Sequence, residues 1–126
     1  MKPDHPEADC PMLLVLDRIA NRWTVLVAGA LAKRTLRFNE LQRVVGGISH
    51  KTLSQTLKAL ERDGFITRKV IPTVPVTVEY SITPMGASLA ATMEQVRVWA
   101  ADNYNDIVES RNAFDARAGN ATAQIA

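Results

Sequence analysis

Hydrophobic residues recur along the chain in blocks whose spacing is helical at both ends and strand-like in between. Apolar side chains dominate 12–20 and 23–32, and they predict two helices, the first beginning at Pro11 behind an Asp9 cap. Glycine is unfavourable inside a helix, so we expect Gly29 to mark a close packing contact in the second one.

Two shorter helices are predicted next, separated by a glycine pair. Apolar residues three positions apart predict a helix over 40–45, capped by Asn39. Leucines spaced by four and three positions predict a second helix over 50–63, and Ser49 is a strong cap for it. Two short helices around a tight turn are typical of a helix-turn-helix.

A strand pattern follows the fourth predicted helix. The runs 65–71 and 76–82 are rich in β-branched residues and predict a hairpin whose tip is stiffened by prolines. Thr83 then predicts the cap, and Pro84 the first residue, of a long last helix that ends near Arg111.

The order of these elements predicts the fold class. It is mainly α with a small β-hairpin: a winged helix-turn-helix with three to four short helices, a two-stranded wing and a long C-terminal dimerisation helix. Residues 34–38 are expected to form a connector with a short extended stretch. We expect a disordered tail over 1–9, one domain over 10–112 and a flexible tail over 113–126.

Composition narrows the class of protein. The chain has 126 residues, of which 47% are hydrophobic and 22% charged, which is typical of one globular domain. No apolar run is long enough to span a membrane, and the N-terminus lacks the apolar core of a signal peptide, so a cytoplasmic location and no membrane partner are expected. With one cysteine, two histidines and no phosphate-binding glycine loop, we expect no metal, no cofactor and no enzyme.

Positive charge is concentrated in the middle of the chain. Between Lys33 and Lys69 there are nine basic and three acidic residues, whereas the rest of the chain has six basic and ten acidic ones. A basic centre within an acidic frame favours an anionic polymer as partner, with an ordinary solvated surface as the alternative.

The helix over 50–63 carries this charge on one face. With about 100° per residue, Leu53, Leu57 and Leu60 form one buried stripe, and Lys51 and Gln55 lie on the opposite face. Such a helix fits a major groove, where lysine contacts phosphate or guanine and glutamine pairs with adenine. Any amphipathic surface helix would show the same division, so the hypothesis depends on the neighbouring helix and hairpin as well.

The hairpin and the preceding connector supply further basic residues. The wing could follow the DNA backbone or enter a minor groove, although charges at strand ends also protect a sheet edge from aggregation. The predicted contacts with double-stranded DNA are therefore Arg37, Ser49, His50, Lys51, Thr52, Ser54, Gln55, Lys58, Arg68 and Lys69.

The motifs along the chain are Trp23-Thr24, Arg37-Phe38 before Glu40-Leu41, Ile48-Ser49, Asp63-Gly64, Glu79-Tyr80, and Thr83 with Gly86. With these motifs in this order the chain resembles the HxlR-type winged-helix transcription regulators, relatives of the MarR group. The resemblance covers about 10–99 and departs from the family pattern at 20–22 and at Val76. It implies a homodimeric bacterial regulator that binds a palindromic operator through 49–63 and a wing at 68–77.

The first and last helices are too apolar for one small domain to cover. A twofold dimer would bury them, although the last helix could instead fold back over its own domain. The predicted dimerisation residues are Leu13, Leu14, Leu16, Leu89, Met93, Val96 and Trp99.

Cys10 is the predicted redox-sensing residue. Its position near the start of a helix lowers the pKa of the thiol, whereas the adjacent acidic residues raise that pKa. The resemblance matches Cys10 to a cysteine that senses oxidants or electrophiles in some members of the family. With no second cysteine, oxidation would join two chains or add a small thiol, while an inert interface thiol is the alternative.

Two other functions are kept open. A small-molecule effector could bind a pocket lined by Met12, Met85, Met93 and Trp99. A winged-helix module that binds protein rather than DNA is the other.

Overall fold

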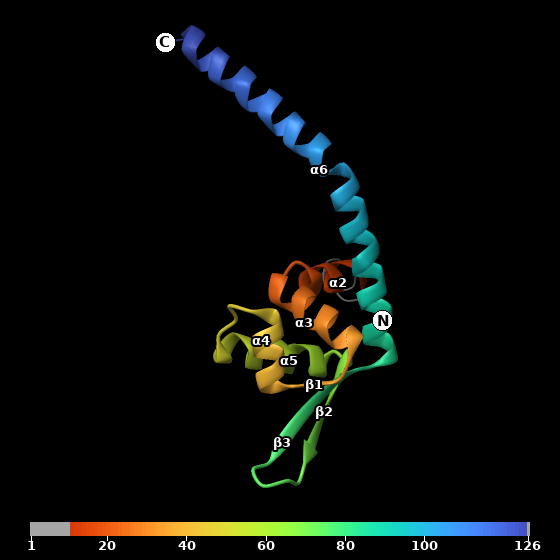
Figure 1. The fold of residues 1–126 in the computed structure, drawn as a ribbon. Coiled ribbons are helices and arrows are strands. Elements are labelled where there is room, and N and C mark those ends of the chain that lie inside the picture. Colours follow the sequence, from red (N-terminus) through yellow and green to blue (C-terminus); the bar gives the residue numbers. More distant parts are fainter. Residues whose placement is uncertain (1–10, 126) are drawn as a thin grey trace, which may run out of the picture. The chain divides into compact units, whose positions relative to one another are not determined.

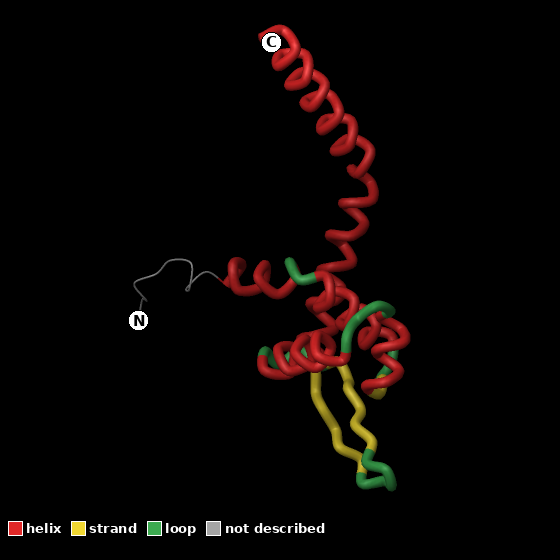
Figure 2. The backbone as a smooth tube through the Cα atoms, turned by 90° about the vertical axis from the view of Figure 1, so that its left-hand side faces the viewer, coloured by secondary structure: helices red, strands yellow, loops and turns green. Residues whose placement is uncertain are grey.

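The computed structural model describes residues 11–125, with side chains as far as residue 120 (Figures 1 and 2). The chain divides into two compact units, 1–93 and 94–126. The elements are α2 (Pro11–Ile19), α3 (Arg22–Lys33), β1 (Leu36–Arg37), α4 (Phe38–Val45), α5 (His50–Arg62), β2 (Ile66–Ile71), β3 (Thr77–Ile82) and α6 (Pro84–Ile125). Among the described residues, no helix is both long enough and apolar enough to cross a membrane.

The predicted winged helix-turn-helix is confirmed in the first unit. Helices α4 and α5 lie on either side of a turn in which Gly46 and Gly47 have φ of 70° and 75°, conformations that favour glycine. The wing is the antiparallel hairpin of β2 and β3, with Ile66 opposite Ile82 and Ile71 opposite Thr77. Figure 2 shows the hairpin extending past the helices.

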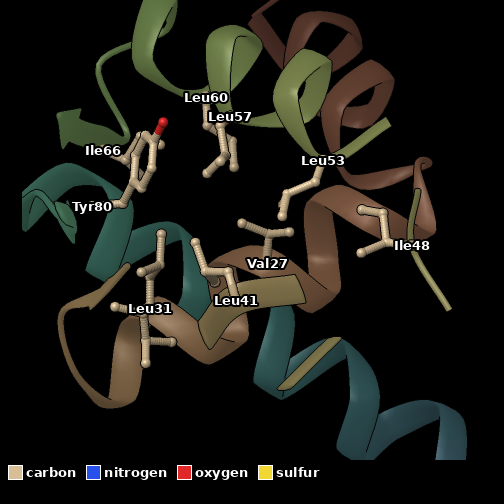
Figure 3. Packing of buried hydrophobic residues seen from close by; sticks show 10 residues of the cluster. Val27, Leu31, Leu41, Ile48, Leu53, Leu57, Leu60, Ile66 and Tyr80 are labelled. Carbon is tan, nitrogen blue, oxygen red and sulfur yellow. The ribbon is translucent and has the colours of Figure 1, made fainter. Parts of the chain in front are cut away.

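The core lies between α3, α4, α5 and the base of the sheet. In Figure 3, the side chain of Val27 lies next to Leu53 of α5, and Leu31 lies beside Leu41 of α4. Leu53, Leu57 and Leu60 are 0–2% exposed, so the predicted buried stripe of α5 is confirmed. Each of these leucines stabilises the fold by roughly 1.5–3 kcal/mol relative to an exposed position. This packing fixes which face of α5 is left to solvent.

Both predicted caps around α5 and α6 are confirmed. The Ser49 hydroxyl accepts a hydrogen bond from the Thr52 backbone N–H at 3.0 Å. Thr83 Oγ1 accepts the Gly86 N–H at 3.0 Å and donates to the carbonyl of Gly64 at 2.7 Å. Thr83 therefore ties the start of α6 to the turn that ends α5.

Gly86 allows this junction to be tight. A Cβ at Gly86 would lie 2.0 Å from the Phe65 carbonyl oxygen and 2.8 Å from Ile82 Cγ1. At Gly29, by contrast, a Cβ would meet nothing within 4 Å. The expected close packing at Gly29 is therefore wrong, and the glycine that packs closely is Gly86.

One prediction about the start of α4 is wrong because of a short-range hydrogen bond. Helix α4 begins at Phe38, so Asn39 already lies inside the helix and does not cap it. The extended residue before the helix is Arg37, whose backbone N–H donates to Glu40 Oε1 at 2.9 Å. The short extended stretch predicted within 34–38 is confirmed: it is β1, which pairs with β3 and completes a three-stranded sheet of order β1-β3-β2.

The last helix is longer than predicted. α6 continues to Ile125, so the end expected near Arg111 is wrong. Several alanines and no proline follow Arg111, and alanine is the best helix former. The predicted tail over 1–9 and Cys10 lie outside the described residues.

Candidate nucleic-acid interface

The solvent face of α5 carries the predicted groove-reading side chains. Lys51, Gln55 and Lys58 are exposed, opposite the buried leucines. None of the three makes a hydrogen bond or an ion pair with another described residue. Gln55 and Thr52 both line a hollow of about 150 Å³. The amide of Gln55 and both ammonium groups are thus available to a partner.

The first turn of α5 is held by its own side chains. The hydroxyl of Ser49 donates to that of Thr52 at 2.9 Å, so these two predicted DNA contacts first of all form the helix cap. The His50 ring packs on the Phe38 ring at the start of α4, with ring centroids 4.6 Å apart. Ser54 is half-buried beside this turn.

The two basic wing residues lie on opposite faces of the hairpin. Successive side chains of a strand alternate between faces, so Arg68 and Lys69 point to different sides. Arg68 is paired with Tyr80, on the face that packs against the core, and Lys69 is paired with Glu79. Both basic side chains are exposed, and neither has an ion-pair partner among the described residues.

Arg37 shares the outer face of the sheet with Lys69. It is paired with Glu79 across β1 and β3, and its Nε lies 3.9 Å from Glu79 Oε2. Glu40 accepts the Arg37 N–H, and this hydrogen bond, together with the neighbouring Arg34, lowers the pKa of Glu40 below its ordinary value. The start of α4 is therefore a set of partly balanced charges.

The predicted dimerisation residues divide into two groups. Six of them are wholly or partly accessible on the described chain: Leu13, Leu14, Leu16, Leu89, Val96 and Trp99. Met93 is only 9% exposed and is covered by its own chain. The apolar pattern of α6 did not predict that Met93 differs from the other six, because a buried and an exposed position can lie on the same helix face.

A cavity of about 470 Å³ lies between α2, the end of α5 and the start of α6. It is lined mainly by apolar side chains, with Arg18 and Asp63 in its wall. Of the four residues predicted for an effector pocket, Met85 lines this cavity. Met12 and Trp99 are more than half exposed, and Met93 is buried.

Comparison with known proteins decides the family. A family model described as HxlR-like helix-turn-helix matches residues 18–108. The chain belongs to this family. It is therefore a transcriptional regulator with a helix-turn-helix DNA-binding fold, not an enzyme, and the predicted resemblance is confirmed.

Individual relatives agree with this assignment. This HxlR-family chain is 41% identical over 103 residues to the HTH-type transcriptional regulator YtfH of Escherichia coli strain K12, with 82% of each chain covered. Its structure is similar to that of the transcriptional regulator ytfH from Salmonella typhimurium, with a TM-score of 0.71, 40% identity and coverage of 83% of this chain and 94% of that one. It is also similar to the redox regulator HypR in its reduced form, with a TM-score of 0.71, 34% identity and coverage of 80% and 99%.

Proposed function

We propose that this HxlR-family protein binds a palindromic DNA operator as a homodimer and represses transcription. The observation that carries the proposal is the exposed, unpaired face of α5 that bears Lys51, Gln55 and Lys58. Long basic and amide side chains on a helix whose other face is buried can reach base edges and phosphates in a major groove.

The roles of these side chains follow from their place on the helix. His50, Lys51, Ser54 and Gln55 lie in the N-terminal half, which usually reaches the base edges. Lys58 lies one turn later and is assigned to the phosphate backbone. Arg68 and Lys69 are assigned to the wing contact, with one of them on each face of the hairpin.

Exposed apolar surface supports the homodimer. On α2, Met12 and Leu14 are both 68% exposed, and on α6, Trp99 is 61% exposed. Apolar surface of this kind is usually covered by a partner, and a twofold dimer would place two α5 helices about 34 Å apart, one turn of DNA. Sedimentation of wild type and Leu14→Asp tests this: a dimer that the substitution dissociates supports the proposal, and a monomeric wild type contradicts it.

An oxidant effector is proposed through Cys10. The similarity to HypR, whose structures are described as reduced and oxidised forms of a redox regulator, favours it. Two Cys10 thiols of two chains would lose two electrons and two protons to an oxidant such as diamide and form one intersubunit disulfide. A mixed disulfide with a small thiol is the second form of the same switch.

The experiment that tests the proposed function is a mobility shift with the protein's own promoter region over a salt series. We expect specific binding that weakens steeply as salt rises, because phosphate contacts release counterions. Absence of binding at low salt would contradict DNA binding and favour a protein-interaction module. Mapping of binding sites across the genome, with and without oxidant, would then identify the operator.

A further inference from the structure

A cleft of about 510 Å³ opens between the start of α4 and the tip of the wing. Both walls belong to the first unit, so their relative placement is part of one compact body. The α4 wall is polar and the wing wall is mainly apolar. The lining residues that matter here are Arg37, Asn39 and Arg43 on one side, and Pro75, Val76 and Val78 on the other.

Arg43 gives the cleft its net positive charge. Arg37 lies near Glu79, and Arg34 lies 3.5 Å from Glu40, so these two arginines face two carboxylates. Arg43 is exposed and has no hydrogen bond or ion pair with another described residue. An anion that enters the cleft would therefore meet one unpaired guanidinium group.

The opposite wall is suited to a sugar rather than to a bare ion. Val76 is 63% exposed at the wing tip, and Val78 is partly buried next to it. An apolar wall facing a cationic wall matches a sugar-phosphate strand, whose deoxyribose has apolar carbon faces and whose phosphate carries the charge. A hydrated phosphate ion would gain nothing from the valines.

We propose that this cleft holds one phosphodiester of the DNA backbone, that Arg43 binds its charge and that Val76 packs against the adjoining sugar. The proposal rests on the proposed function and adds a backbone contact from α4 that lies outside α5 and the wing strands. The contact fixes the register of the protein on the duplex without reading a base.

The test measures DNA binding by fluorescence anisotropy over a salt series, with the promoter fragment and with a random duplex. Loss of one phosphate contact reduces the slope of log affinity against log salt by about 0.9. We expect Arg43→Ala to lower the slope by this amount on both duplexes, and Arg43→Lys to keep it. Arg111→Ala, an exposed arginine of the second unit with no partner among the described side chains, is the matched control and should leave the slope unchanged.

A second variant probes the apolar wall. Val76→Asp places a carboxylate opposite Arg43 at an exposed site, so it should fold normally and weaken binding to both duplexes. If DNA binding by the wild type weakens with salt but the slope for Arg43→Ala is unchanged, the proposed phosphate contact in the cleft is wrong. The proposed function would still stand. A wild type that binds no DNA would instead overturn the proposed function itself.

Calorimetric titration with inorganic phosphate distinguishes a site for the DNA backbone from a site for a free phosphate ion. We expect no measurable binding of inorganic phosphate to the wild type. Binding that Arg43→Ala abolishes would assign a free-anion site and overturn the proposal.

Discussion

Arg18 and Asp63 form an ion pair that joins α2 to the last turn of α5. The Arg18 Nε donates to Asp63 Oδ2, and Nη2 lies 3.5 Å from Oδ1. This hydrogen bond raises the pKa of Arg18 above its ordinary value. The pair is formed across 45 positions of sequence and connects the predicted dimerisation helix to the predicted DNA-reading helix.

A double-mutant cycle should detect this pair. The side chains are 34% and 22% exposed, so solvent screens the interaction only in part. We expect Arg18→Ala and Asp63→Ala to be less than additive, with a coupling energy of at most about 1 kcal/mol in denaturant unfolding. The more exposed pair of Glu94 and Arg97 should give a smaller coupling. Fully additive effects at Arg18 and Asp63 would show that the pair contributes no stability.

Two glycine-to-alanine substitutions should change the free energy of unfolding in opposite directions. Gly86→Ala places a Cβ 2.0 Å from a backbone oxygen, so the start of α6 must shift, and we expect a loss of about 1–3 kcal/mol in the free energy of unfolding. Gly29→Ala meets open space inside a helix and should stabilise the protein by about 0.5–1 kcal/mol. A Gly86→Ala protein as stable as wild type would contradict the tight junction.

Acid should remove the stabilisation that Glu40 provides. Its pKa is lowered in the folded state, so its contribution is complete above the ordinary value of 4.5 and is lost as pH falls through the lower folded-state pKa. We expect the difference in Tm between wild type and Glu40→Gln to be largest near neutral pH and to shrink below pH 4.5. Glu109→Gln, at an exposed site on α6, is the control and should show no such trend. A constant difference across the acid range would argue against the ionised carboxylate as the source.

Oxidation should act through Cys10. We expect diamide to change the operator affinity of wild type and to leave that of Cys10→Ser unaffected. Non-reducing electrophoresis distinguishes an intersubunit disulfide from a mixed disulfide with a small thiol. Equal responses of the two proteins would show that Cys10 is not the sensor.

Local signals made much of this fold predictable. The leucine spacing of α5, the cap at Ser49 and the pair Thr83-Pro84 each act within a few residues, and the structure agrees with them. The wing strands were also predicted to within about one residue at each end. Such short patterns can be recognised in the sequence alone, because the period of a helix or strand determines which residues share its buried face.

The remainder depends on contacts between distant segments. The extended stretch that became β1 was predicted, but its pairing with β3 was not, because the two strands lie more than 40 positions apart. The contact between Gly86 and Phe65 and the pair of Arg18 and Asp63 join separate elements, and no local spacing marks them. In the candidate site, the sequence predicted the exposed residues of α5, but Arg43 was counted only as part of the basic segment, because the cleft at α4 depends on where the wing folds.

The central claim is that α5 reads DNA bases with Gln55 and holds the backbone with Lys58. The most direct measurement is the affinity of Gln55→Ala and Lys58→Ala for the operator and for random DNA at several salt concentrations. We expect Gln55→Ala to lose roughly 1–3 kcal/mol on the operator and little on random DNA. Lys58→Ala should weaken both and flatten the salt slope. Equal losses on the two DNAs for Gln55→Ala would contradict the account.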